Sequence, residues 1–207
     1  MWFIIGRIGA LGVLLLMVLA GWLVPQSQAA DPSAAAKAYF AGGCFWCMEE
    51  AFEKVPGVTA VVSGYMGGRV ENPSYEQVSA GGTGHAESVE VVYDPAKASY
   101  TTLLDAFWHN VDPVTPNAQF CDHGSQYRSV IFYQGEEQKR LAEESKRAIE
   151  QSRRLTQPIV TELTKASQFY PAEDYHQDFY KKNPIRYKFY KFNCGRAQRL
   201  EEVWGAP

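Results

Sequence analysis

The chain has 207 residues, a formal net charge of −3 from 20 Lys+Arg against 23 Asp+Glu, and 4 Cys. Its 46% hydrophobic and 21% charged residues exclude wholesale disorder and a polytopic membrane protein. The length suits one globular domain, and the near-neutral charge argues against a protein held on nucleic-acid phosphates. Four cysteines are too few for a disulfide-dense miniprotein.

The first thirty residues have the pattern of an export signal. Arg7 is followed by an uncharged apolar run over 8–24, and Ser27 and Ala29 are small residues two apart. A short basic start, an apolar middle and a small-x-small end are typical of a cleaved secretory signal. We expect 1–29 to be a signal peptide and 30–207 to be one exported, periplasmic domain. An uncleaved anchor facing the same compartment is the alternative.

Strand and helix signals alternate along the rest of the chain. The pattern predicts, in chain order, a strand at 37–41, a helix at 44–54, a strand at 58–63, a Gly-rich loop at 64–69, a short helix from Tyr75, a strand at 87–93, a helix at 101–111, a polar loop at 112–125, a strand at 127–133, a charged surface helix at 136–154, a strand at 159–163 and a helix at 172–181. From Asn183 we expect a long irregular C-terminal tail. The alternation indicates an α/β domain of α+β type, a two-layer sandwich of a mixed sheet with packed helices.

Cys44 is the first candidate for chemistry. It follows a predicted strand and the turn Gly42-Gly43, and it opens a predicted helix, where unpaired N–H groups and the helix dipole favour a thiolate. Cys47 lies one turn on, at disulfide spacing, so a structural disulfide is an alternative. A zinc site that adds Cys121 and His123 is another, although no second C-x-x-C is present.

The residues between these cysteines are Phe45 and Trp46, which form either an apolar cage beside a nucleophile or ordinary core. Glu87 heads a core-facing strand row, where burial would raise its pKa toward that of a general acid; a solvated strand-end carboxylate is the alternative. Other candidate polar groups are Tyr65, Tyr75, Tyr127, Asp122 and His123. We expect His176 to be a structural hydrogen-bonding histidine.

Six ordered motifs resemble the peptide methionine sulfoxide reductase A family, and with a C-terminal Asn-Cys-Gly-Arg they span essentially the whole mature chain. The motifs are Gly43-Cys44-Phe45-Trp46, Gly64-Tyr65-Met66-Gly67-Gly68, Asn72-Pro73-Ser74-Tyr75-Glu76, Gly84-His85-Ala86-Glu87, Asp122-His123-Gly124-Ser125-Gln126-Tyr127-Arg128-Ser129 and Ala172-Glu173-Asp174-Tyr175-His176-Gln177.

The resemblance implies a role for each candidate in reducing the S epimer of methionine sulfoxide, free or in proteins. Cys44 would be the nucleophile that becomes a sulfenic acid, and Glu87 the acid acting on the sulfoxide oxygen. Tyr75 and Tyr127 would donate hydrogen bonds to that oxygen.

The resemblance also implies that Phe45 and Trp46 hold the S-methyl group and that Asp122 positions the substrate. It implies no metal and no organic cofactor, with electrons from a thioredoxin-like protein or another external dithiol. We expect a monomer that binds oxidised proteins or free methionine sulfoxide and no nucleic acid. The alternative function is a thioredoxin-type dithiol–disulfide oxidoreductase using Cys44 and Cys47.

The thiol that resolves the sulfenic acid is left open by the motifs. We favour Cys194, because a mobile irregular tail could bring it to Cys44, and we keep Cys47 as a direct resolver or a shuttle. Cys121 departs from the family pattern, which more often has another residue before Asp-His-Gly, so no role is assigned to it.

Overall fold

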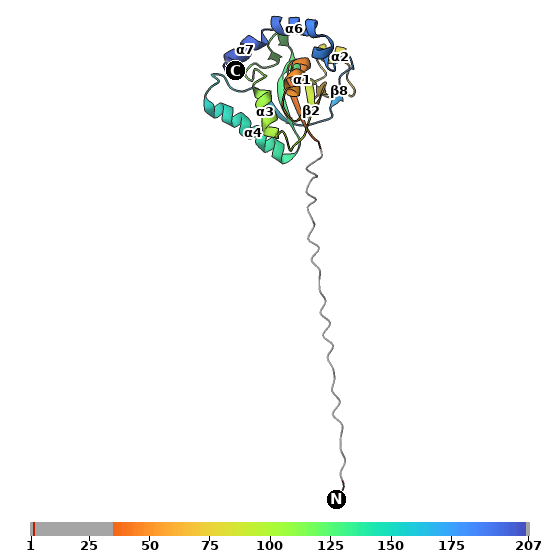
Figure 1. Cartoon of the computed structure of the whole chain (residues 1–207), viewed down its shortest axis with the longest axis vertical. Helices are drawn as coiled ribbons and strands as arrows, with labels where there is room; N and C mark the ends of the chain where they lie inside the picture. Colours follow the sequence, from red (N-terminus) through yellow and green to blue (C-terminus); the bar gives the residue numbers. More distant parts are fainter. Residues whose placement is uncertain (1, 3–34, 206–207) are drawn as a thin grey trace. The chain divides into compact units, whose positions relative to one another are not determined.

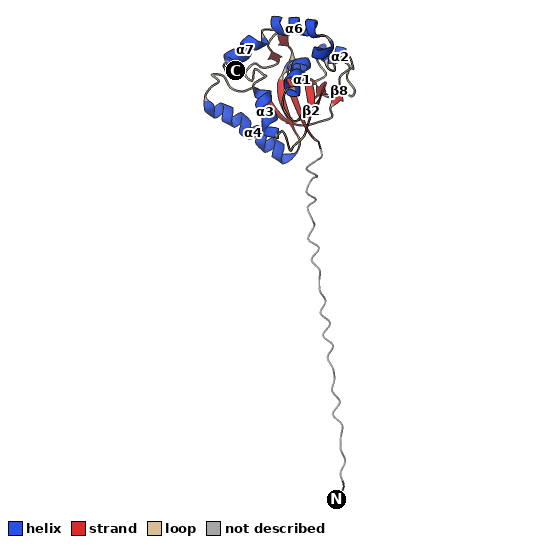
Figure 2. Ribbon diagram, in the orientation of Figure 1, coloured by secondary structure: helices blue, strands red, loops and turns tan. Residues whose placement is uncertain are grey.

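One six-stranded mixed sheet forms the centre of the fold (Figures 1 and 2). Its strands are β1 (Ala36–Gly42), β2 (Val58–Met66), β3 (Ala86–Tyr93), β6 (Ser129–Tyr133), β7 (Glu162–Lys165) and β8 (Tyr170–Pro171), in the order β7-β6-β1-β3-β2-β8. Neighbouring strands are antiparallel except the β6–β7 pair, which is parallel. A separate two-stranded ribbon joins β4 (Ala118–Gln119) to β5 (Asp122–His123).

This computed structural model describes residue 2 and residues 35–205. Apart from Trp2, the predicted signal peptide at 1–29 lies outside the described residues, so it stays a prediction. Across 35–205, no helix combines the length and the apolar character needed to cross a bilayer.

Helices cover one face of the sheet. They are α1 (Phe45–Glu53), α2 (Tyr75–Ser79), α3 (Tyr100–Trp108), α4 (Gly135–Ser152), α5 (Phe179–Lys182), α6 (Pro184–Asn193) and α7 (Arg196–Trp204), with a 3₁₀ turn, η1, at Ser125–Tyr127. Phe40 of β1 stacks on Phe52 of α1 and Phe107 of α3, with ring centroids 4.8 and 5.4 Å apart. The opposite face buries Tyr39 and Phe132. The mixed sheet with packed helices is therefore confirmed.

The predicted irregular tail from Asn183 is wrong, because α6 and α7 occupy it. Ile185, Phe189 and Phe192 of α6 are all at least 70% exposed, while Tyr187 is buried. Apolar residues on several sides of a helix give no single amphipathic stripe, so the sequence pattern does not reveal the helix.

One loop prediction and one helix prediction also change. The predicted Gly-rich loop begins inside β2, because Gly64 pairs with Pro171 and an added Cβ there would lie 2.4 Å from the Phe169 ring. The predicted helix at 172–181 is mostly turns, with α5 at its end. Gln177 explains why: its side-chain oxygen accepts from Ser63 N–H, and its side-chain nitrogen donates to Ser63 O, which ties the segment to β2.

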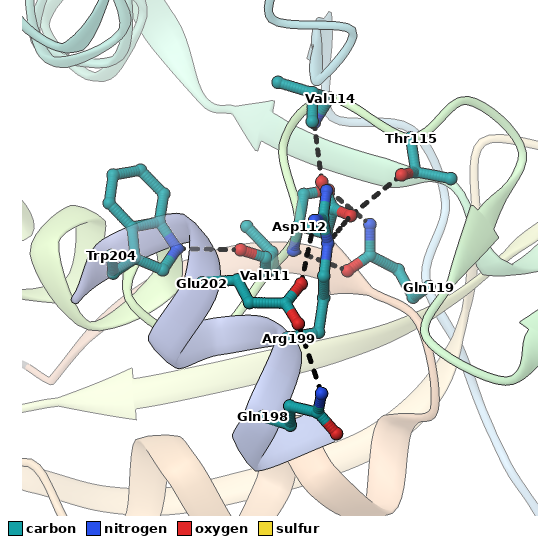
Figure 3. Close-up of polar contacts among 9 residues, drawn as sticks. All are labelled: Val111, Asp112, Val114, Thr115, Gln119, Gln198, Arg199, Glu202 and Trp204. Atoms are coloured by element: carbon teal, nitrogen blue, oxygen red, sulfur yellow. Dashed lines mark hydrogen bonds and ion pairs between the residues drawn. The ribbon is translucent and has the colours of Figure 1, made fainter. Parts of the chain in front are cut away.

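A buried polar network attaches α7 to the loop before β4 (Figure 3). Asp112 accepts a hydrogen bond from Arg199 Nε at 2.8 Å, and its backbone N–H and C=O pair with the side chain of Gln119. Trp204 Nε1 donates to Val111 O at 2.9 Å. Burial opposes ionisation of Asp112, but the hydrogen bond from Arg199 and others outweigh it and lower the pKa of this carboxyl. The network fixes the loop that leads to Cys121 and the β5 residues.

Candidate active site

A glycine turn places Cys44 at the start of α1. Gly43 has φ +77°, and a Cβ there would lie 2.4 Å from Gln119 Cβ, so the turn requires glycine for both conformation and space. Cys44 is the N-cap residue and is 6% exposed. The expected strand–turn–helix context of this cysteine is confirmed.

Glu87 lies in β3 opposite Tyr65 of β2 and is 3% exposed. Its Oε2 accepts a hydrogen bond from Phe45 N–H at 3.0 Å, which brings the carboxyl group to the N-terminus of α1. Burial raises the pKa of Glu87 to about 8; the Phe45 N–H opposes this rise and the Asp122 carboxylate adds to it. The alternative of a solvated strand-end carboxylate is wrong, and the group is protonated at neutral pH.

All seven residues expected to bind substrate or perform chemistry in the first step line one pocket. The pocket is lined by Cys44, Phe45, Trp46, Tyr75, Glu87, Asp122, Tyr127 and Tyr190. They come from the start of α1, from α2, β3, β5, η1 and α6. The two candidate resolving cysteines, Cys47 and Cys194, are not among these lining residues.

The pocket tyrosines are held as neutral phenols. Burial and then the Glu87 carboxylate raise the pKa of Tyr75 to about 12, and the same two effects raise the pKa of Tyr127. Glu173 fixes this side of the pocket by accepting from Tyr75 N–H at 2.8 Å and from Tyr65 Oη at 3.0 Å. Neutral phenols can donate hydrogen bonds to an oxygen atom in the pocket.

Aromatic packing makes the apolar wall. Trp46 stacks on Phe179 of α5 with ring centroids 3.7 Å apart, and its Nε1–H donates to His176 Nδ1 at 3.1 Å. Phe45 packs against Tyr65 at 5.9 Å between centroids. His176 is 2% exposed and holds the indole in place, in keeping with the structural role expected for it.

Tyr190 completes the pocket and is not singled out by the sequence pattern. Its Oη donates to Asp122 Oδ2 at 2.5 Å. Burial raises the pKa of Asp122, although this hydrogen bond opposes the rise. Tyr190 lies four residues before Cys194, so the two share a helix face, but that spacing has meaning only once the segment is known to be helical.

Cys44 and Cys47 are free buried thiols in hydrogen-bonding contact with each other. Burial, Cys47 and the Glu87 carboxylate raise the pKa of Cys44. The hydrogen bond from Cys44, together with Arg196 and the Tyr187 hydroxyl, lowers the pKa of Cys47 to about 6 against the opposing effect of burial. The two thiols therefore influence each other's ionisation, and the helix N-terminus is not the only effect acting on Cys44.

Cys121 and Cys194 form a disulfide, with an S–S distance of 2.04 Å and Cα atoms 4.8 Å apart. Cys194 is 9% exposed at the C-cap of α6, so the mobile tail that motivated its choice as resolver is wrong. Cys121, which the sequence left without a role, is its partner. The zinc alternative loses a ligand, because the Cys121 sulfur is already bonded.

Comparison with known proteins places these residues in a family context. A family model described as peptide methionine sulfoxide reductase matches residues 36–207. A peptide methionine sulfoxide reductase MsrA of Listeria innocua is 51% identical over 168 residues, which are 81% of this chain and 95% of that protein.

Solved structures resemble the fold as well. Mxr1 from Saccharomyces cerevisiae in reduced form has a TM-score of 0.69 at 31% identity, covering 74% of this chain and 88% of that chain. Methionine sulfoxide reductase A of Corynebacterium diphtheriae has a TM-score of 0.66 at 33% identity, covering 75% of this chain and 78% of that chain.

Proposed function

Because this chain belongs to the peptide methionine sulfoxide reductase A family, we propose that it reduces the S epimer of methionine sulfoxide, free or in proteins, to methionine. The observation that carries the proposal is the convergence of Cys44, protonated Glu87 and two neutral tyrosines on one pocket with an aromatic wall. Each of these groups can contribute to the reduction of a sulfoxide.

A sulfoxide sulfur is a poor electrophile because its oxygen would have to leave as hydroxide. Glu87, with a pKa of about 8, carries a proton at neutral pH and can give it to that oxygen. Tyr75 and Tyr127 donate hydrogen bonds to the same oxygen as charge develops on it. Phe45 and Trp46 receive the S-methyl group.

Cys44 attacks the sulfoxide sulfur as Glu87 protonates the oxygen. Cys47, whose pKa is lowered by its neighbours, accepts the proton that Cys44 loses. This attack forms a bond between Cys44 Sγ and the substrate sulfur. The hydroxyl then transfers from the substrate sulfur to Cys44 Sγ as that bond breaks, so the sulfoxide is reduced by two electrons to methionine and Cys44 is oxidised by two electrons to a sulfenic acid. Cys47 is therefore a proton acceptor in this step.

We propose that Cys47 also resolves the sulfenic acid, which its position one helical turn from Cys44 supports. Its sulfur attacks Cys44 Sγ, the S–O bond breaks, and the hydroxyl leaves with a proton as water. An external dithiol, either a small molecule or a thioredoxin-like protein, must then reduce the resulting disulfide. The yeast relative Mxr1 has been crystallised in complex with Trx2, which supports a thioredoxin-like donor here.

The test is incubation of the purified protein with resolved epimers of methionine sulfoxide and dithiothreitol, followed by quantification of methionine. We expect methionine from the S epimer and none from a Cys44→Ser variant. A thioredoxin-type oxidoreductase would instead reduce protein disulfides, with no dependence on Glu87. Activity on disulfides without methionine formation would contradict the proposal.

We also propose that residues 1–29 direct export to the periplasm and are cleaved, which the apolar run and the Ser27-Gln28-Ala29 site support. An exported enzyme has no direct access to cytosolic thioredoxin, so its donor would be a membrane-relayed thioredoxin-like protein. N-terminal sequencing of the exported protein tests cleavage. An intact Met1 on a membrane-extracted form would contradict it.

A further inference from the structure

The four cysteines form two pairs with different access to solvent. The inner pair, Cys44 and Cys47, is reduced, and the two residues are 6% and 3% exposed. The outer pair is oxidised and is asymmetric, because Cys121 is exposed whereas Cys194 is 9% exposed. A protein-sized dithiol therefore has one accessible sulfur to attack, that of Cys121.

We propose that Cys121 and Cys194 are a redox-active outer pair that carries electrons from the external dithiol to the inner pair, with Cys121 as the point of entry. This inference rests on the proposed function and assigns Cys121 a role that the family motifs do not supply. On this proposal the Cys121–Cys194 disulfide transfers electrons, in addition to linking α6 to the loop before β5.

The surroundings of the outer disulfide favour attack on Cys121 and departure of Cys194. The backbone N–H of Cys121 donates to Cys194 Sγ at 3.2 Å, which stabilises negative charge on that sulfur. A carboxylate oxygen of Asp122 lies 3.8 Å from Cys121 Sγ and disfavours negative charge there. The sulfur whose thiolate is better stabilised leaves faster, so Cys194 is the leaving thiolate.

The released Cys194 thiolate would lie beside the active-site pocket. The sulfurs of both outer cysteines and an Asp122 carboxylate oxygen lie within 4.8 Å of one another, and Asp122 lines the pocket. Cys194 Sγ is 3.9 Å from Tyr190 Oη, and Tyr190 also lines the pocket with Cys44. Cys194 is thus the outer sulfur on the catalytic side, and Cys121 is the outer sulfur on the solvent side.

The exchange steps balance. A donor thiolate attacks Cys121, the Cys121–Cys194 bond breaks, and the donor's second thiol closes the donor disulfide and frees Cys121. After a turnover has produced Cys44–Cys47, the Cys194 thiolate attacks Cys47 Sγ and releases Cys44. Cys121 then attacks Cys194, which reforms the outer disulfide and releases Cys47. The donor dithiol loses two electrons and the inner disulfide gains two.

The experiment maps disulfides after a single turnover. The full chain is reduced to four thiols, freed of reductant without oxygen, and given one equivalent of S-methionine sulfoxide. Free and oxidised cysteines are then labelled with different alkylating groups and identified by mass spectrometry. A sample without sulfoxide must keep four free thiols.

We expect one equivalent of methionine, a Cys121–Cys194 disulfide, and free Cys44 and Cys47. Methionine accompanied by a persistent disulfide within the inner pair, or between Cys44 and Cys194, with Cys121 free, would overturn the relay while the proposed function stands. Absence of methionine would refute the proposed function and the relay with it.

Two matched variants separate a relay from a cross-link, because Cys121→Ser and Cys194→Ser both remove the outer disulfide. With a thioredoxin-type protein donor, we expect multi-turnover rates at least about 10-fold lower in both, since the buried inner pair is shielded from the donor. Cys194→Ser should accumulate Cys44–Cys47, whereas Cys121→Ser should trap Cys194 in a disulfide with an inner cysteine. Wild-type recycling rates in both would show that the outer disulfide is structural alone.

Discussion

Replacement of Glu87 by glutamine separates proton donation from every other property of this side chain. The amide keeps the shape and still accepts from Phe45 N–H, but it has no proton to transfer. With a pKa of about 8, about 90% of wild-type Glu87 is protonated at pH 7. Loss of a positioned general acid costs about 10²- to 10⁴-fold in rate, or about 3–5 kcal/mol of barrier.

Glu87→Gln should slow the reaction, but at high pH it should make the protein more stable relative to the wild type. The folded-state pKa of Glu87 is raised from 4.5 to about 8 by burial. Between pH 4.5 and pH 8 the Glu87 side chain is therefore protonated in the folded state and ionised in the unfolded state. The stability that this proton contributes is fully present below pH 4.5 and is lost as pH rises toward 8. The loss is at most about 5 kcal/mol, at about 1.4 kcal/mol per pH unit. Glutamine has no charge to bury, so Glu87→Gln should not lose this stability.

Rapid-quench single turnovers with pre-reduced enzyme measure the rate, and urea unfolding at pH 5 and pH 8.5 measures the stability. The wild-type rate should fall as pH rises through about 8. Between pH 5 and pH 8.5, the free energy of unfolding should decrease more in the wild type than in the Glu87→Gln variant. Burial raises the pKa of Glu49 to about 7 as well, but this group is common to both proteins and cancels in the difference.

Glu90→Gln is the matched control, because Glu90 lies on the same strand and its carboxylate binds Lys37 and Tyr39 outside the pocket. It should keep the wild-type single-turnover rate. A Glu87→Gln enzyme that makes methionine within about threefold of the wild-type rate would refute the assignment of the acid. A stability difference independent of pH would refute the argument from burial.

Three further substitutions test how the pocket is held. Tyr190→Phe removes the hydroxyl that donates to Asp122. Because a hydrogen bond to a charged group contributes about 1.5–3 kcal/mol, single-turnover kcat/KM should fall about 10- to 100-fold. An unchanged kcat/KM would contradict a role of Tyr190 in the pocket. Gly43→Ala places a Cβ against Gln119 at a positive φ, so urea unfolding should show a loss of about 2 kcal/mol or more and methionine formation should slow; wild-type stability would show that the turn has room. Asp112→Ala leaves the backbone and side-chain donors around it unpaired, and chemical denaturation should show a loss of about 1–3 kcal/mol; a loss below about 0.5 kcal/mol would contradict the importance of this network.

The local order of strands and helices was predictable because it depends on short-range periodicity. The alternating row from Glu87 to Tyr93 and the glycine turn before Cys44 both appear in the structure as the sequence indicates. The seven pocket residues were also predictable, but through the resemblance to a family and not through spacing, since they lie on five separate elements.

The C-terminal part was not predictable in the same way. The apolar residues of α6 lie on two opposite faces, an exposed one with Ile185, Phe189 and Phe192 and an inner one with Tyr187 and Tyr190. No single apolar stripe therefore marks the inner face, which is identified only where Tyr187 and Tyr190 meet α1 and β5. Tyr190 thus enters the pocket through a tertiary contact between segments 68 residues apart.

The cysteines mark the boundary between the two kinds of information. The sequence by itself determined that Cys44 begins a helix after a glycine turn, because that depends on a strand, a turn and a helix that are adjacent along the chain. The tertiary structure alone decided that Cys121 pairs with Cys194, that burial raises the pKa of Cys44 and that neighbouring groups lower the pKa of Cys47. Disulfide partners and thiol pKa values depend on distances and burial among groups far apart in the chain, and only the folded packing sets those.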